Sequence, residues 1–121
     1  MLFRSVRVGS HIFVAGTAPI MPNDADPPTG AYDQAKRVIE IAAAALAEAG
    51  ATLDDVVRTR LYLTDAADID EVGRAHGEAF ATARPATTGI VTTLLDPRWK
   101  VEIEFDAVVD RKSTRLNSSH T

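Results

Sequence analysis

Residues 101–107 alternate between apolar and acidic side chains, and this pattern constrains the fold more than any other stretch of the chain. A period of two places successive side chains on opposite faces of a β-strand. One face of this strand would be apolar and lie against a core, while the other would carry Glu102, Glu104 and Asp106. Aligned carboxylates repel one another unless basic groups lie opposite, so we expect a basic strand beside this one.

Residues 57–64 alternate in the way that such a partner strand requires. One face would carry Val57, Thr59, Leu61 and Leu63, and the other Arg58, Arg60 and Tyr62. We predict that the basic face lies on the same side of the sheet as the three carboxylates, with pairing between strands or between subunits.

Two further strand signals come at the start of the chain. Residues 6–8 and 12–15 predict a hairpin whose turn is Gly9-Ser10-His11. Gly16 is expected to break the second strand and to allow a close approach of another group to the backbone. Residues 17–31 contain four prolines and predict a stiff loop.

Two helices and one more strand complete the pattern. Apolar residues recur every three or four positions over 31–49 and 69–80, which predicts helices, with Gly50 ending the first and Asp68 capping the second. Residues 86–95 predict a strand. This order predicts an α+β fold in which two helices cover one face of a single sheet. The other face would be exposed or covered by another subunit.

The chain has 121 residues, which suits one domain, and it contains no cysteine. Its ends, residues 1–5 and 110–121, read as translated sequencing adapter, so we expect the native domain to be 6–109, truncated at its N-terminus. Without those ends, which hold four basic residues and one acidic residue, the formal net charge changes from −4 to −7. An acidic chain without an apolar span predicts a soluble cytoplasmic protein that binds neither nucleic acid nor membrane.

Few residues in the sequence are candidates for catalysis or for binding a metal. His11 is expected in a solvated turn and His76 on a helix face at the edge of the core, so no hydrolytic triad is indicated. No set of ligands has the spacing of a metal site, and we expect no metal or cofactor. Glu102 and Glu104 could form a carboxylate pair or a solvated strand face. A site built from one carboxylate, backbone groups and hydroxyls would remain.

Eight short motifs, in order over residues 6–109, resemble the Rid (reactive intermediate deaminase, YjgF-like) family. They are Val8-Gly9, Phe13-Val14-Ala15-Gly16, the helix with Gln34, Ala49-Gly50-Ala51, Asp55-Val56-Val57, Leu61-Tyr62-Leu63-Thr64-Asp65, Arg84-Pro85-Ala86-Thr87-Thr88 and Val101-Glu102-Ile103-Glu104. The resemblance implies a chorismate-mutase-like mixed sheet with two helices on one face, and a homotrimer around a central barrel with clefts between neighbours.

The resemblance also implies an activity, the hydrolysis of short-lived enamines and imines to ketoacids and ammonia without metal or cofactor. Glu102 matches the carboxylate that positions water. The arginine that grips the substrate carboxylate is replaced by Thr87, which cannot form a bidentate clamp. By the same resemblance Ala15, Gly16, Thr87 and Thr88 are the candidate substrate-binding residues. Arg84 is a poor substitute for the arginine, and Arg98 could reach the site only from a loop.

Two functions stay open on these residues. The first is an enamine or imine deaminase-like hydrolase with altered substrate preference. The second is a non-catalytic, chaperone-like trimeric module that binds a small metabolite beside the uncharged Thr87-Thr88-Gly89 stretch. A ribonuclease activity has also been attached to the family, and the acidic charge argues against it here.

Overall fold

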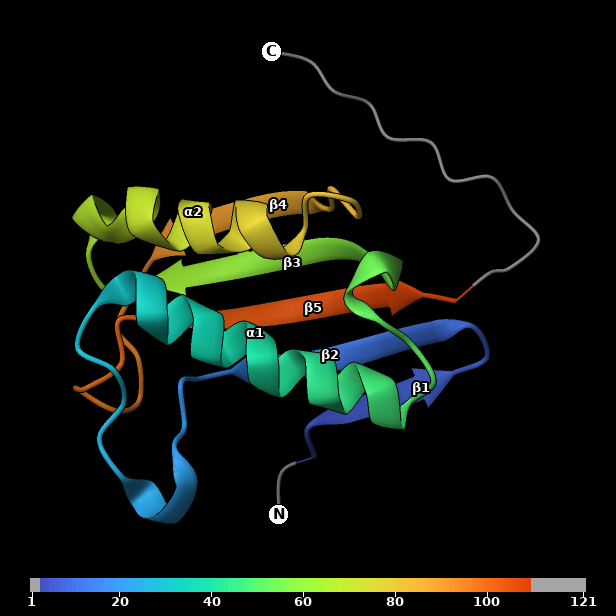
Figure 1. Cartoon of the computed structure of the whole chain (residues 1–121), viewed down its shortest axis with the longest axis horizontal. Helices are drawn as coiled ribbons and strands as arrows, with labels where there is room; N and C mark the ends of the chain where they lie inside the picture. Colours follow the sequence, from blue (N-terminus) through green and yellow to red (C-terminus); the bar gives the residue numbers. More distant parts are fainter. Residues whose placement is uncertain (1–2, 110–121) are drawn as a thin grey trace.

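The computed structural model describes residues 3–109, which form one mixed five-stranded sheet with two helices on one face (Figure 1). The strands are β1 (Ser5–Val8), β2 (His11–Thr17), β3 (Val56–Leu63), β4 (Ala86–Val91) and β5 (Val101–Val108). The helices are α1 (Ala31–Glu48) and α2 (Ile69–Ala79), and short 3-10 turns lie at Pro22–Asp24, Leu53–Asp55 and Ala66–Asp68. The α+β class predicted from the sequence is confirmed.

The sheet order is β1-β2-β5-β3-β4, with β3 and β4 parallel and every other pair antiparallel. The parallel pair needs a crossover, and α2 supplies it. β5 lies in the middle because its apolar face is the most continuous, and its four inward side chains are at most 1% exposed. Ser5, which the predicted domain boundary leaves out, pairs with Val14 in this sheet. Residues 1–2 and 110–121 lie outside the described part.

Helix α1 packs on β2 and β5 through the predicted apolar face, where Val38, Ala42 and Leu46 are fully buried. It ends where the sequence predicts, because Gly50 adopts a φ of +87°. The amides of Gly50 and Ala51 then reach back to two carbonyls of the last turn, at 3.1 and 2.8 Å. This is the Schellman arrangement, in which glycine avoids the steric cost of the left-handed conformation.

Two strands differ from the sequence expectations. β2 continues to Thr17 and contains a bulge before it, where Gly16 was expected to break the strand. β4 ends at Val91, because its only partner, β3, ends at Leu63. The predicted strand 86–95 is therefore four residues too long.

The start of α2 also differs. Asp68 makes no capping hydrogen bond, because it has helical geometry, and Asp65 instead accepts one from the Ala67 amide at 2.9 Å. Ile69 was expected to face inward, but it is 44% exposed beside the edge strand. No helix in residues 3–109 is long and apolar enough to cross a membrane.

The open face of the sheet has the charge pairing that the sequence predicts. The β3–β5 register places Arg60 opposite Glu104 and Tyr62 opposite Glu102. Arg60 forms an ion pair of 3.3 Å with Asp106. One carboxylate of the acidic row is thereby compensated, and the two glutamates remain.

Candidate active site

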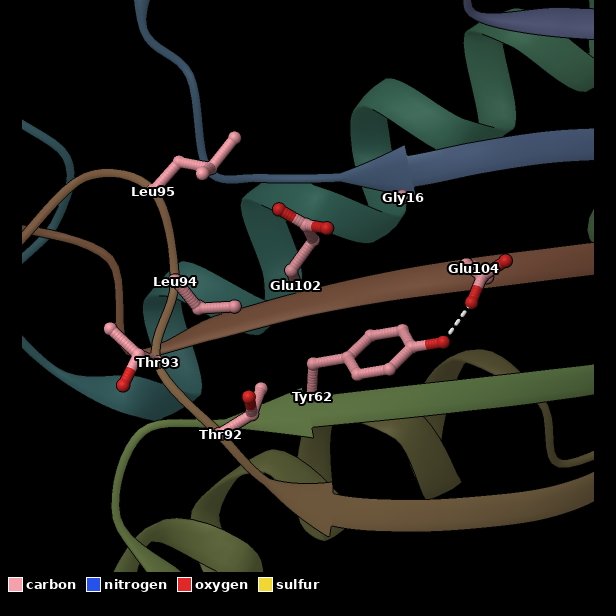
Figure 2. Close-up of a pocket in the computed structure, with 8 residues that line it drawn as sticks. All are labelled: Gly16, Tyr62, Thr92, Thr93, Leu94, Leu95, Glu102 and Glu104. Atoms are coloured by element: carbon pink, nitrogen blue, oxygen red, sulfur yellow. Dashed lines mark hydrogen bonds between the residues drawn. The ribbon is translucent and has the colours of Figure 1, made fainter.

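A pocket of about 280 Å³ lies on the open face of the sheet, where β2, β3 and β5 meet the segment that follows β4 (Figure 2). Its lining residues come from four parts of the chain: Gly16, Tyr62, Thr92, Thr93, Leu94, Leu95, Glu102 and Glu104. Two carboxylates and one phenol lie on one side, and two hydroxyls and two leucines on the other. The pocket therefore combines titratable groups with an apolar wall, as small-molecule sites commonly do.

Glu102 occupies the centre of this arrangement. Figure 2 shows its side chain rising from β5 between Gly16 and the segment with Leu94 and Leu95. The carboxylate is half-buried and makes no hydrogen bond or ion pair with any other residue between 3 and 109. Burial, together with the negative charge of Glu104, raises the pKa of Glu102 above its usual value. An unpaired carboxylate with a raised pKa is suited to accept a proton from a bound water.

Gly16 makes room for that carboxylate. A β-carbon at this position would collide with Oε2 of Glu102. The β2–β5 register pairs Val14 with Phe105 and Thr17 with Ile103, so β2 has one extra residue here. Such a bulge re-aims the strand and is common beside active sites. The close approach predicted for Gly16 is thus confirmed.

Glu104 and Tyr62 form a second polar unit in the pocket. The Tyr62 hydroxyl donates a hydrogen bond to Oε1 of Glu104 (Figure 2). This bond, followed by burial and the negative charge of Glu104, raises the pKa of the phenol. Tyr62 therefore stays protonated, and its proton is committed to Glu104.

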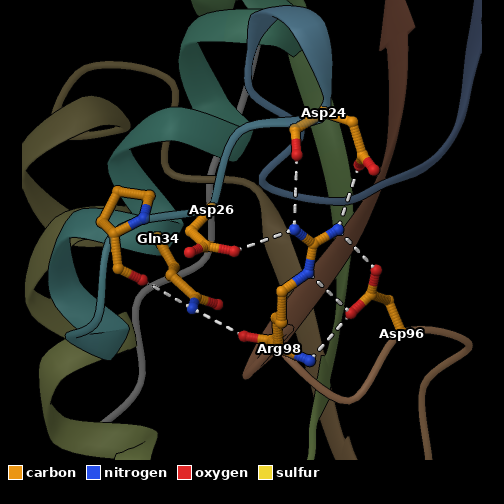
Figure 3. Close-up of polar contacts among 6 residues, drawn as sticks. Asp24, Asp26, Gln34, Asp96 and Arg98 are labelled. Atoms are coloured by element: carbon orange, nitrogen blue, oxygen red, sulfur yellow. Dashed lines mark hydrogen bonds and ion pairs between the residues drawn. The ribbon is translucent and has the colours of Figure 1, made fainter.

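The segment that closes the pocket is joined to a cluster around Arg98 (Figure 3). The guanidinium contacts Asp96 at 2.8 Å and both Asp24 and Asp26 at 3.1 Å. Hydrogen bonds from Arg98 hold the pKa of Asp96 below its usual value. The cluster ties the proline-rich loop to the loop before β5, and it leaves Arg98 engaged by three carboxylates.

The buried side chain of Gln34 joins the same two loops. Its side chain is 1% exposed. The amide nitrogen donates to the carbonyls of Pro28 and Arg98, at 2.8 and 3.0 Å, and the amide oxygen accepts from the Lys100 amide at 2.7 Å. Buried backbone groups in two loops are satisfied in this way, so the loops are fixed relative to α1 and to the start of β5.

Thr87 lies apart from the pocket, on the helix side of the sheet edge. Its hydroxyl donates to the Pro85 carbonyl at 3.0 Å. Because a hydroxyl has one proton, Thr59 must donate to Thr87 across 2.8 Å. Nε2 of His76 then donates to Thr59, also across 2.8 Å. Burial lowers the pKa of His76, which favours the neutral ring in this chain of hydrogen bonds.

The structure brings together some of the residues expected from the sequence and separates others. Glu102 and Gly16 share the pocket. Ala15 lines a neighbouring hollow of about 480 Å³ on the same face. Thr87 and Thr88 lie on β4 and line neither hollow. Arg98 is held in its own cluster of three aspartates.

Sequence reasoning placed Tyr62 on the correct face but assigned it no role. The alternation over residues 57–64 was the signal, because it sets Tyr62 beside the glutamates. Thr92 to Leu95 were missed because they were expected to continue a strand. Among residues 3–109 there is no group of three or more His, Cys, Asp or Glu side chains placed to hold a metal ion.

Comparison with known proteins identifies the family. The family model described as Endoribonuclease L-PSP matches residues 3–109. A RutC family protein of Pyrococcus abyssi is 37% identical over 102 residues, covering 84% of this chain and 80% of that protein. TdcF of Escherichia coli, whose name places it among reactive intermediate deaminases, is 28% identical over 108 residues, covering 87% and 84%.

Two solved structures extend this comparison to the fold. Rv2704 from Mycobacterium tuberculosis, described as a member of the YjgF/YER057c/UK114 family, has a TM-score of 0.79 at 40% identity and covers 88% of this chain and 85% of its own. Escherichia coli TdcF with bound serine has a TM-score of 0.83 at 25% identity, covering 91% and 89%. The chain therefore belongs to the Endoribonuclease L-PSP family, which is the Rid (YjgF-like) family that its sequence motifs resemble.

Proposed function

We propose that this chain hydrolyses small reactive imines or enamines and that Glu102 positions and activates the water. The observation that carries the proposal is the half-buried, unpaired carboxylate of Glu102 against Gly16, inside a pocket of about 280 Å³. Burying a charge without a partner is energetically unfavourable. A carboxylate kept in that state is more readily explained by a reaction than by stability.

The reaction balances with one water and no other reactant. Glu102 takes a proton from water while the oxygen bonds to the imine carbon. It returns this proton to the nitrogen, which gives a carbinolamine, and then transfers the hydroxyl proton to the nitrogen as the carbon–nitrogen bond breaks. A carbonyl compound and ammonia leave, and Glu102 is again ionised. A raised pKa brings the carboxylate closer to the operating pH, which suits a group that both takes and gives a proton.

We further propose that three copies of the chain assemble around their open faces. Val6 and Phe13 on that face are 55% and 44% exposed, and Ile90 and Val91 on the edge strand are 48% and 55% exposed. Apolar area of this kind on a sheet is more stable when covered. Light scattering should give about three times the chain mass of 13.0 kDa. A monomer at micromolar concentration would contradict the assembly.

The assembly would also give Thr87 and Thr88 a role. Both lie on the exposed edge strand, so a neighbour could bring them to a second copy's pocket. Thr87→Arg should then gain activity on 2-iminobutanoate, because arginine can clamp its carboxylate in bidentate geometry. Thr87→Lys is the matched control, since it adds the charge without the planar fork.

The alternative is a binding module without turnover, and one observation favours it. The Thr87 hydroxyl has its proton and an acceptor site engaged by Pro85 and Thr59. The position of the missing arginine therefore offers a ligand little polar contact. Metabolites that raise the melting temperature without being converted would support this function.

The experiment uses freshly generated imines, with and without a carboxylate, and measures ammonia above the spontaneous rate. The expected result is release by the wild-type chain from at least one imine and none by Glu102→Gln. Circular dichroism confirms that the variant is folded. Absence of release by the wild type, or full activity of Glu102→Gln, would overturn the proposal.

A further inference from the structure

We propose that this pocket selects substrates whose reacting nitrogen is cationic and that carry no carboxylate, and that Glu104 is the residue that sets this specificity. The inference rests on the proposed function, because it concerns the same pocket. Its subject is the charge of the ligand rather than the reaction. A protonated imine is positively charged at nitrogen, whereas a 2-imino acid also carries a carboxylate.

The charges that line the pocket have one sign. Among residues 3–109, the lining includes two glutamates and no lysine, arginine or histidine. Glu102 and Glu104 are two residues apart on one face of β5, so their side chains point the same way. A ligand carboxylate placed here would meet two like charges, and a cationic nitrogen would meet two opposite charges.

The phenol in the pocket does not offset this charge. Tyr62 is the only aromatic hydroxyl in the described lining, and its proton is donated to Glu104. It therefore cannot donate to an anionic ligand without giving up that bond. The hydroxyl proton of Tyr62 is therefore already used within the Tyr62–Glu104 pair.

Two basic side chains near the pocket, Arg60 and Arg98, already form ion pairs. Arg60, opposite Glu104 in the ladder, forms its ion pair with Asp106 at 3.3 Å. Arg98 is held by three aspartates at 2.8 to 3.1 Å. Recruiting either cation for a ligand would break existing pairs. The leucine wall, with Leu95 94% exposed, instead offers contact to a short apolar group.

A matched pair of imines tests the proposal on the full chain. The first is 2-iminobutanoate. The second is the carboxylate-free imine that an amine oxidase forms when it oxidises butylamine. Hydrolysis of the carboxylate-free imine should be favoured at least tenfold in kcat/KM, because each charge contact changes binding by roughly tenfold or more. In Glu104→Gln the preference should fall several-fold, whereas Glu71→Gln on α2 should keep it.

Each outcome distinguishes the two claims. Equal or faster hydrolysis of 2-iminobutanoate by the wild type would overturn the specificity and leave the hydrolase function standing. If neither imine is hydrolysed, the proposed function fails. The charge preference of the pocket is then tested by comparing the binding of a cationic and an anionic ligand. Butylammonium should then shift the amide NMR signals of Gly16 and of Thr92 to Leu95 at concentrations where butyrate does not. Equal shifts, or tighter binding of butyrate, would refute the proposal. This arm needs no variant, so it holds even if Glu104→Gln misfolds.

Discussion

Two acidic regions of this protein differ in how their charge is compensated. Around Arg98, three aspartates share ion pairs with one guanidinium, and hydrogen bonds lower the pKa of Asp96. In the pocket, Glu102 pairs with no cation among residues 3–109, and burial with Glu104 raises its pKa. The two shifts have opposite directions because one region contains a hydrogen-bonding cation and the other buries a carboxylate beside a like charge.

The difference follows from position in the chain. The aspartates are in loops, which can adjust until each oxygen meets the guanidinium. Glu102 is fixed on a central strand, with Gly16 on one side and the β3 strand on the other. The protein therefore accepts an unfavourable charge at Glu102, as proteins do at functional sites.

The largest effect is expected for Gln34→Leu, in the region where Gln34 and Arg98 join two loops. Three backbone groups in buried or partly buried positions would lose their partner, each at about 1–3 kcal/mol. We expect the free energy of unfolding to fall by at least about 3 kcal/mol, measured by urea denaturation. Glu48→Leu, on the exposed part of the same helix, is the control. Equal effects of both variants would show that the Gln34 contacts contribute no stability.

The next largest effect separates activity from stability. Gly16→Ala places a methyl group where the Glu102 carboxylate lies, and the flexible side chain must move. We expect kcat/KM for imine hydrolysis to fall at least tenfold, about 1.4 kcal/mol in transition-state stabilisation. The melting temperature should change little, because Gly16 needs no left-handed φ. Full activity in a folded Gly16→Ala protein would contradict the placement of Glu102.

A smaller effect, of the opposite sign, is expected in Glu102→Gln. The folded state disfavours the ionised carboxylate, so Glu102 reduces stability as the pH rises above the usual glutamate pKa of about 4.3. The variant should melt a few degrees above the wild type at pH 7. The difference should disappear below about pH 4, where the carboxyl is protonated in both states. A lower melting temperature of the variant at pH 7 would mean that the charge has a partner.

The smallest effect is expected in Asp24→Asn, on the compensated side. The Asp24 side chain is 90% exposed, and exposed ion pairs contribute little. Scanning calorimetry should find no change beyond experimental error at pH 7. A large loss of stability would show that the Arg98 cluster depends on each of its carboxylates.

Much of the fold could be predicted because its signals are local. The alternation at residues 101–107, the helical period of α1 and Gly50 each depend on neighbours in sequence. The end of β4 could not be predicted, because it depends on where β3 ends. The bulge at Gly16 similarly depends on the register with β5.

The candidate site divides in the same way. Glu102 and Gly16 follow from motifs, and the face of Tyr62 follows from alternation. The hydrogen bonds among Thr87, Thr59 and His76 join three elements and have no local signal. The single sign of charge in the pocket became visible only once Arg60 and Arg98 were found paired elsewhere.

The central claim is that the uncompensated carboxylate of Glu102 acts on the substrate, whereas the carboxylates paired with Arg98 take no part in the reaction. Its most direct test is ammonia release from the imine of butylamine by the wild type, Glu102→Gln and Asp24→Asn, each a folded protein. Both variants change one carboxylate to an amide. We predict that Glu102→Gln falls to the spontaneous rate while Asp24→Asn keeps the wild-type rate. Equal rates in the two variants, at any level, would contradict the account.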